Sequence, residues 1–192
     1  MILLRAFIAI EIPQEIKRQI AGQTAELRRM VGSSVRWVTP ENIHLTLKFL
    51  GEISPTNIDL LAQALKTEVG QHLSFEMNVN GLGAFPNVRR PRVIWIGLDA
   101  PPDLTRLQHH LETTTARLGY ISDDKPFSPH LTIGRVREQL SSDESQALRS
   151  ALESAKVGAL GKFTVKSVHL FQSELKPAGP IYTCISTAAL GG

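Results

Sequence analysis

The sequence predicts an α+β fold with two lobes, in which two antiparallel sheets face a central cleft and the helices lie on the outside. Three observations lead to this prediction. Apolar residues alternate along some segments and recur every three or four positions along others, so one chain carries both strands and helices. The order helix, strand, helix, strand, strand occurs twice, over about residues 13–98 and 101–190. Two units of this length indicate an internal duplication and not a solenoid.

The chain begins with a segment that is typical of a buried strand, residues 3–11, where apolar side chains fill one face. A helix is predicted from Pro13 to Gly32, because proline suits the first turn of a helix and glycine can end one. A second strand is predicted at residues 43–50, followed by Gly51.

Ser54 and Pro55 have the residue types of a helix N-cap and first position, so the next helix begins there. Two strands are then predicted at residues 74–84 and 92–98. The segment between them, residues 85–91, is rich in proline and arginine and is typical of a loop.

The second unit repeats this order. A helix begins at Pro101 and a strand follows at residues 129–136. Ser142 can cap the next helix, which is predicted to run to about residue 157. The remaining segments predicted as strands are residues 163–172 and 181–190.

Length and charge limit the organisation of the protein and its partners. A chain of 192 residues fits one domain, so residues 1–192 are treated as a single domain made of the two repeat units. The net charge is +3, from 21 Lys and Arg against 18 Asp and Glu. This mildly basic balance permits a nucleic-acid or phosphate partner without requiring one.

Cysteine content and hydropathy exclude other classes of protein. The one cysteine, Cys184, rules out a disulfide framework and a multi-cysteine metal site. No apolar run approaches the roughly 20 residues that span a bilayer, and Arg5 interrupts the apolar N-terminal segment, which lacks the pattern of a signal peptide. We expect a cytoplasmic, monomeric protein without a membrane anchor.

The strongest local feature is a pair of tetrapeptides, His-Leu-Thr-Leu at residues 44–47 and His-Leu-Thr-Ile at residues 130–133. Side chains on a strand alternate between two faces. His44, Thr46 and Lys48 are therefore predicted to share one face, and His130 and Thr132 the corresponding face of the second unit. A pseudo-twofold arrangement would bring these two polar faces together across the cleft.

Two histidines facing one another suit proton transfer near neutral pH, because one imidazole can accept a proton while the other donates one. The hydroxyls of Thr46 and Thr132 can donate hydrogen bonds to a phosphate oxygen. This set favours in-line displacement at a phosphodiester. The sequence contains no zinc-protease motif, P-loop or dinucleotide fingerprint, so neither a metal nor a cofactor is expected at this site.

The tetrapeptides match the H-x-T/S-hydrophobic signature of the two-histidine (2H) phosphoesterase superfamily. Longer segments resemble the LigT-type RNA 2′,3′-cyclic phosphodiesterases, also called the 2′-5′ RNA ligase family. These segments span nearly the whole chain and are residues 5–10, 44–51, 92–97, 125–135, 170–175 and 179–182.

The resemblance implies metal-free hydrolysis of an RNA 2′,3′-cyclic phosphate to a 2′-phosphate. It also implies the roles of the histidines, which the residues alone do not orient: His44 as the proton donor to the leaving 3′-oxygen, and His130 as the proton acceptor that activates water. The implied partners are RNA ends, including tRNA fragments, or small cyclic nucleotides. Some relatives also join tRNA halves through a 2′-5′ linkage.

Four further residues are candidates for substrate binding. Phe7 and Tyr182 are predicted either to stack on a base or to pack in the core. Lys48 shares the predicted face of His44, although an exposed strand lysine needs no special role. Arg135 matches an arginine of the family pattern, but strict alternation places it away from His130 unless a bulge turns it.

The sequence leaves two further groups of basic residues outside the predicted site. The arginines at positions 89, 90 and 92 form either a solvated loop or a contact to an RNA backbone. The histidines outside the two motifs lack any pairing in the sequence and are assigned to helix ends and the surface; they are His72, His109, His110 and His169.

Two other functions compete with the cyclic phosphodiesterase. A non-catalytic module could hold an RNA end in the same cleft, although a binder has no need of two proton carriers. A metal-dependent phosphoesterase could use His44 and His130 as ligands, but neither motif carries Asp or Glu on the histidine face. A binding module would form a complex with RNA and release no product. A metal-dependent phosphoesterase would lose its activity in the presence of a chelator, whereas the cyclic phosphodiesterase would not.

Overall fold

The computed structural model describes residues 3–122, 125–177 and 179–191. It confirms the predicted α+β class. The helices are α1 (Gln14–Gln23), α2 (Ala25–Val31), α3 (Ile58–Val69), α4 (Pro102–Arg117) and α5 (Ser142–Ser154). The strands are β1 (Leu4–Glu11), β2 (Val35–Trp37), β3 (His44–Ile53), β4 (Phe75–Phe85), β5 (Val93–Leu98), β6 (His130–Val136), β7 (Ala159–Val165), β8 (Ser167–Lys176) and β9 (Gly179–Ala189).

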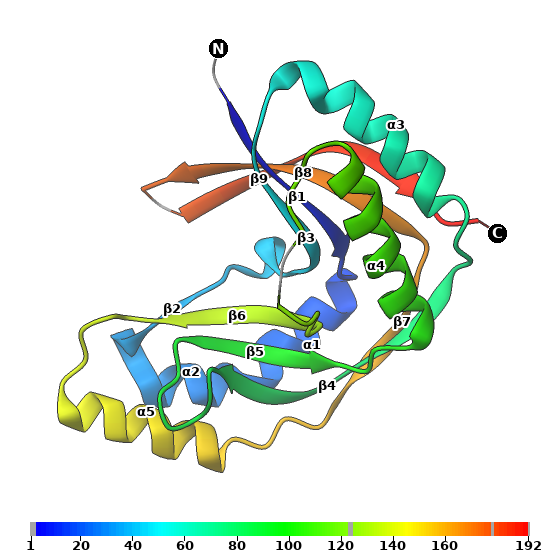
Figure 1. Ribbon diagram of the computed structural model, residues 1–192. Coiled ribbons are helices and arrows are strands. Elements are labelled where there is room, and N and C mark those ends of the chain that lie inside the picture. Colours follow the sequence, from blue (N-terminus) through cyan, green and yellow to red (C-terminus); the bar gives the residue numbers. More distant parts are fainter. Residues whose placement is uncertain (1–2, 123–124, 178, 192) are drawn as a thin grey trace.

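All the paired strands lie antiparallel in one curled sheet with the order β7-β4-β5-β6-β3-β1-β8-β9, and β2 adds to β6 (Figure 1). The expectation of two separate sheets is therefore wrong. The two halves of the sheet meet at β3 and β6, where a single residue pair, Leu45 with Leu131, joins them. This narrow junction makes one sheet out of what the sequence suggested were two.

The halves of the sheet do not coincide with the repeat units. One half contains β1 and β3 from the N-terminal part of the chain together with β8 and β9 from its C-terminal part. The other half contains β4 and β5 together with β6 and β7. Each half thus combines strands from both units, so the two units share one sheet.

One face of the sheet packs against the helices and forms the hydrophobic core. Helices α3 and α4 cover the half with β3, β1, β8 and β9, whereas α1, α2 and α5 lie on the half with β4 to β7 (Figure 1). The core includes Ile8, Leu45, Ile94 and Leu131, all 1% exposed or less. We call the opposite face of the sheet, which the helices leave uncovered, the open face.

Several boundaries differ from the sequence prediction. The predicted helix from Pro13 to Gly32 is divided into α1 and α2 at Thr24, whose hydroxyl donates a hydrogen bond to the Ile20 carbonyl at 2.7 Å. Such a bond competes with the regular helical pattern and can bend a helix. Strand β2 was not predicted, since three residues are too few for a periodic pattern.

The later elements also shift. Ser141, and not Ser142, caps α5, because its hydroxyl accepts from the Glu144 amide while the Glu144 carboxylate accepts from the Ser141 amide. The strand predicted at residues 163–172 is two strands, β7 and β8. Strand β3 continues past Gly51, which adopts a positive φ of 70° that favours glycine. No helix of the described residues is long and apolar enough to cross a bilayer.

Candidate active site

The two H-x-T motifs lie side by side at the junction between the two halves of the sheet. Leu45 pairs with Leu131, so the antiparallel register sets His44 across from Thr132, and Thr46 across from His130. Both leucines are buried, whereas the two histidines and two threonines are half-buried on the open face. The fold therefore gathers all four residues around one residue pair.

Both imidazoles are held by the same local contact. The Nδ1 atom of His44 lies 2.8 Å from the Asn42 carbonyl oxygen, and that of His130 lies 2.7 Å from the Ser128 carbonyl oxygen. A carbonyl can only accept, so Nδ1 carries the proton in both rings and Nε2 keeps its lone pair. Within the described residues neither Nε2 has a hydrogen-bond partner, and each is available for proton transfer.

Aromatic rings surround His44. The Phe7 ring stacks on the imidazole with centroids 4.8 Å apart, and the Tyr182 ring meets it edge-on at 5.1 Å. Burial lowers the pKa of His44 to about 4; the hydrogen bond to Asn42 opposes this shift, and the charge of Lys17 adds to it. His44 is therefore neutral at pH 7 in the ligand-free protein.

The turn before His44 is fixed by two contacts that the sequence did not reveal. The Asn42 side-chain amide donates to the Pro180 carbonyl at 2.9 Å, and the buried Lys17 ammonium donates to the Glu41 carbonyl at 3.0 Å. These bonds hold the Asn42 carbonyl that orients the imidazole. The only sequence signal is the position of Asn42 and Ser128, each two residues before a motif histidine.

His130 has a more open setting. The Phe85 ring meets its imidazole edge-on at 4.8 Å, and the Trp95 ring lies 5.3 Å from Phe85. Trp95 pairs with Thr132 across β5 and β6. Aromatic side chains thus flank both motif histidines, but the two sets of contacts differ.

A β-bulge follows each motif threonine. In β3, Thr46 pairs with Ala9 and Lys48 with Ile8, so Leu47 is the extra residue. In β6, Thr132 pairs with Trp95 and Gly134 with Ile94, so Ile133 is the extra residue. An extra residue reverses the faces of the side chains that follow it.

Because of the bulge at Ile133, Arg135 lies on the open face with His130, and its cross-strand partners are the half-buried Val93 in β5 and the exposed Arg36 in β2. Strict alternation placed Arg135 on the other face. The side chain of Arg135 is exposed, and its charge acts on the Tyr182 hydroxyl. Arg135 is therefore available to a ligand on the open face.

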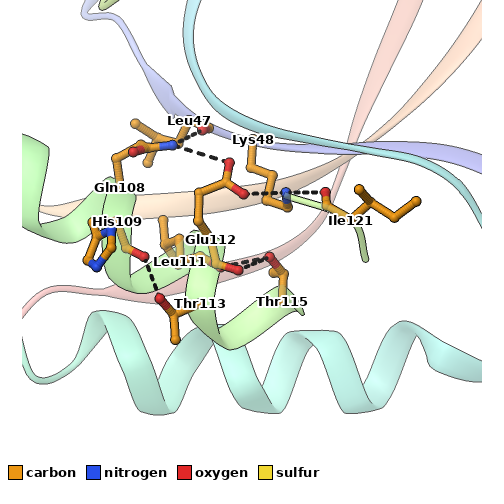
Figure 2. A network of polar contacts seen from close by, with 9 residues as sticks. All are labelled: Leu47, Lys48, Gln108, His109, Leu111, Glu112, Thr113, Thr115 and Ile121. Atoms are coloured by element: carbon orange, nitrogen blue, oxygen red, sulfur yellow. Dashed lines mark hydrogen bonds and ion pairs between the residues drawn. The ribbon is translucent and has the colours of Figure 1, made fainter. Parts of the chain in front are cut away.

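The bulge at Leu47 has the opposite consequence for Lys48. Its side chain is 2% exposed and turns to the helix side, where the ammonium forms an ion pair with Glu112 of α4 at 2.5 Å and donates to the Ile121 carbonyl at 2.8 Å (Figure 2). The expectation that Lys48 shares the face of His44 is wrong. Lys48 links β3 to α4 and does not reach the motif residues.

Phe7 is on the open face, but its ring is covered. It is 3% exposed and lies between His44 and Phe171, whose ring centroid is 5.3 Å away. Of the two predicted roles, packing is the one that the structure supports, since no face of the ring is free to stack on a base. Phe7 supports the imidazole of His44.

Tyr182 is half-buried beside Phe7 and His44. Burial raises the pKa of its hydroxyl, and the positive charges of Arg135 and Arg5 oppose this rise. The sequence analysis did not assign Arg5. The two arginines give the open face a positive region beside Tyr182.

The remaining candidates are spread over the molecule. The arginines at positions 89, 90 and 92 are exposed in and beside the loop between β4 and β5. The assignment of His169 to a helix end or the surface is wrong: it is buried in β8, with the Ser167 and Thr187 hydroxyls 3.0 Å from its ring nitrogens. His109 is exposed as predicted. The other two histidines, His72 and His110, meet at Glu68 on the helix side.

Comparison with known proteins agrees with this geometry. The sequence model of the LigT-like phosphoesterase family matches residues 10–95 and again residues 96–182. The chain belongs to the LigT-like phosphoesterase family. Within this family, an RNA 2′,3′-cyclic phosphodiesterase of Methanothermobacter thermautotrophicus is 32% identical over 94% of this chain and 95% of its own length. The corresponding protein of Archaeoglobus fulgidus is 35% identical, over 93% and 96%.

Solved structures show the same fold. TT0787 of Thermus thermophilus superposes with a TM-score of 0.80 at 28% identity, covering 98% of this chain and 99% of that one. Escherichia coli LigT complexed with 3′-AMP has a TM-score of 0.78 at 27% identity and covers both chains completely, at 100%. LigT has also been solved with phosphate.

Proposed function

We propose that this LigT-like phosphoesterase hydrolyses RNA 2′,3′-cyclic phosphate ends to 2′-phosphates by paired histidine acid–base catalysis without a metal. The observation that carries the proposal is the geometry of the two motifs. Both imidazoles donate Nδ1–H to the carbonyl two residues earlier and turn a free Nε2 to the open face. Relatives covering the same length are named RNA 2′,3′-cyclic phosphodiesterases, which supports this substrate.

In the proposed step, the Nε2 atom of His130 takes a proton from water, whose oxygen attacks phosphorus. The bond from phosphorus to the 3′-oxygen breaks, and His44 gives a proton to that oxygen. The products are a 2′-phosphate and a 3′-hydroxyl, and one proton has moved from His130 to His44 by the time the next cycle begins. An RNA 5′-hydroxyl in place of water would give a 2′-5′ linkage by the same step.

His44 must be protonated to act as the acid, although burial lowers its pKa to about 4 in the free protein. The bound substrate can raise the pKa of His44 again, since a negative phosphate within about 4–6 Å of an imidazole favours its charged form. Proton uptake by His44 is thus coupled to substrate binding, and an empty site keeps this residue neutral.

Thr46 and Thr132 are proposed to donate hydrogen bonds to the non-bridging phosphate oxygens. Their hydroxyls have no hydrogen-bond partner among the residues that the structure describes. Arg135 is proposed to pair with the phosphate, because the bulge in β6 turns it to the same face as His130. Tyr182 completes this side of the site.

We further propose that residues 1–192 act as one functional unit and that a monomer is sufficient. The two histidines come from different repeat units and lie in one sheet. Every proposed catalytic group is therefore supplied by a single chain. The substrate is proposed to be an RNA end, including a tRNA fragment, or a small cyclic nucleotide.

The test is incubation of the EDTA-treated protein with a short RNA that ends in a 2′,3′-cyclic phosphate, with the product identified by phosphorus NMR. We expect a 2′-phosphate and no 3′-phosphate. A stable complex without product would favour the binding module instead. Loss of turnover in EDTA, restored by a divalent metal, would favour the metal-dependent phosphoesterase.

A further inference from the structure

A second cluster of histidines lies on the helix side of the molecule, away from the open face. Glu68 is in the last turn of α3, His72 follows the end of that helix, and His110 is on α4. The Glu68 Oε1 atom lies 3.3 Å from His72 Nε2 and 3.1 Å from His110 Nδ1. The three ligand atoms all lie within 4.8 Å of one another.

These separations fit the coordination sphere of a small cation. Zinc–ligand bonds of about 2.0–2.1 Å in a tetrahedron place neighbouring ligand atoms about 3.3 Å apart. Two of the three separations already match this value. The third would close by a small rotation of His110, whose side chain is 47% exposed.

We propose that Glu68, His72 and His110 form a Zn²⁺ site that joins α3 to α4. Two imidazole nitrogens and one carboxylate oxygen form a donor set that favours Zn²⁺ over Ca²⁺ and Mg²⁺. The ion would replace the two imidazole protons that now point to Glu68.

The surroundings of the cluster supply the other features of a metal site. The Thr114 hydroxyl donates to Glu68 Oε2 at 2.9 Å, the carboxylate oxygen that the two imidazoles do not contact, and so orients the carboxylate. His72 is buried, whereas a surface pocket lined by Gln71, Asp103 and Arg106 opens beside it and His110. The pocket provides an entry path and room for a water as the fourth ligand.

The site is separate from the proposed reaction. Its ligands lie on α3, α4 and the turn after α3, whereas His44 and His130 lie on the face of the sheet that the helices leave uncovered. A cation that binds the folded chain and not the unfolded chain raises the free energy of unfolding by RT ln(1 + c/Kd), where c is the free cation concentration. Zn²⁺ would therefore act as a structural link between two helices.

The first experiment is a Zn²⁺ titration of the chelator-stripped protein against a chromophoric competitor. It uses a background in which His44→Gln and His130→Gln remove the motif imidazoles as alternative ligands. We expect one Zn²⁺ per chain. The His110→Gln variant should bind at least about tenfold more weakly, and Thr114→Val about 10–100-fold more weakly.

His109→Gln is the matched control, because it removes the neighbouring exposed imidazole of the same helix. It should bind Zn²⁺ like the parent protein. A thermal unfolding midpoint that rises with Zn²⁺ in the parent and in His109→Gln, but not in His110→Gln, would support the link between the helices. The visible spectrum of the Co²⁺ form should show the intense bands of tetrahedral coordination in the parent only when His110 is present.

The proposal is overturned if binding does not saturate at one ion, or if His109→Gln and His110→Gln weaken it equally. Turnover of the cyclic phosphate is a separate readout. It is measured on the chain with both motif histidines intact, and it should be the same in His110→Gln and in the wild type. Failure of the zinc site thus leaves the proposed phosphodiesterase untouched, and the reverse also holds.

Discussion

The two motif histidines share a backbone contact and differ in burial. Each donates Nδ1–H to the carbonyl two residues earlier, so each presents Nε2 to the open face. His44 is enclosed by Phe7 and Tyr182, whereas the ring partner of His130 is Phe85 at one edge. The shared contact makes both rings competent for proton transfer, and the different surroundings allow them different roles.

Removing either imidazole should cut turnover of the cyclic phosphate by about 10²–10⁴-fold, which is the usual contribution of a general acid or base. His44→Ala and His130→Ala are the single variants. The double variant should lose much less than the product of the two factors, because the residues act as a unit. Wild-type turnover in either single variant, measured on RNA under saturating conditions, would exclude the two-histidine mechanism.

A sulfur atom in place of the leaving 3′-oxygen can assign the two roles. A thiolate leaves without protonation far more readily than an alkoxide, since a thiol has a pKa of about 8.5. On a 2′,3′-cyclic substrate with 3′-bridging sulfur, His44→Ala should recover most of its turnover and His130→Ala should not. Recovery in His130→Ala alone would reverse the assignment of acid and base.

The pKa of His44 also predicts how stability depends on pH. The unfolded residue binds a proton near pH 6.5, and the folded residue only near pH 4. Between these values the unfolded chain binds more protons, so acidification through this range favours unfolding. His44→Gln should therefore lose less stability than the wild type between pH 7 and about pH 4.5.

This prediction is checked by urea unfolding at the two pH values, with His130→Gln as the variant that removes the more exposed imidazole. An acid-induced loss in His44→Gln as large as that of the wild type would show that another group is responsible.

At the scale of the elements, the two bulges decide which side chains reach the substrate. Leu47 and Ile133 are the extra residues in β3 and β6, each directly after a motif threonine. The bulge in β6 turns Arg135 to the open face, and the bulge in β3 turns Lys48 away from it. The bulges occupy equivalent positions, but Lys48 is four residues after His44 and Arg135 is five residues after His130, so the two positive charges lie on opposite faces of the sheet.

The ion pair between Lys48 and Glu112 should contribute to stability and not to substrate binding. The two side chains are 2% and 14% exposed, so removing one partner leaves a poorly solvated charge. Glu112→Gln should lower the free energy of unfolding by about 3–5 kcal/mol. The double variant Lys48→Met with Glu112→Leu should recover most of that loss, because neither charge remains.

Urea unfolding measures the stability, and KM for a cyclic nucleotide measures the binding. A Lys48→Met protein that remains folded but has a strongly raised KM would show that Lys48 takes part in substrate binding. We expect KM to stay close to that of the wild type, since Lys48 lies on the helix side of β3 (Figure 2).

At the scale of the whole molecule, the catalytic groups lie at the narrowest junction of the sheet. Among the described strands, β3 and β6 are joined by a single residue pair, Leu45 with Leu131, and each half of the sheet contains strands from both parts of the chain. The two motif histidines therefore lie on adjacent strands that come from different parts of the chain. The exposed arginines in and beside the loop between β4 and β5 lie on one of these halves.

We expect the arginine loop to contact the RNA backbone. Replacing Arg89, Arg90 and Arg92 with alanine should raise KM for an RNA substrate and reduce the salt dependence of log KM by up to about two units of slope. KM for a cyclic mononucleotide should not change. A triple variant of exposed arginines elsewhere controls for net charge: Arg18→Ala, Arg29→Ala and Arg117→Ala. Equal effects of both triple variants would leave the loop without a specific role.

The sequence by itself determined the α+β class, the duplicated order of elements and the two motifs, because these depend on local periodicity and on residue types at short spacing. His44, Thr46, His130 and Thr132 needed only the alternation of a strand to be assigned to one face. The family also followed from these motifs.

Tertiary structure decided the rest. The faces of Lys48 and Arg135 depend on bulges that are defined only by pairing with neighbouring strands. The meeting of His72 and His110 depends on the packing of α3 against α4. The joining of the two halves into one sheet depends on one ladder pair between residues 86 positions apart, Leu45 and Leu131. Local sequence patterns carry no information about such pairings, because the energy that selects them comes from burial of side chains distant in the chain.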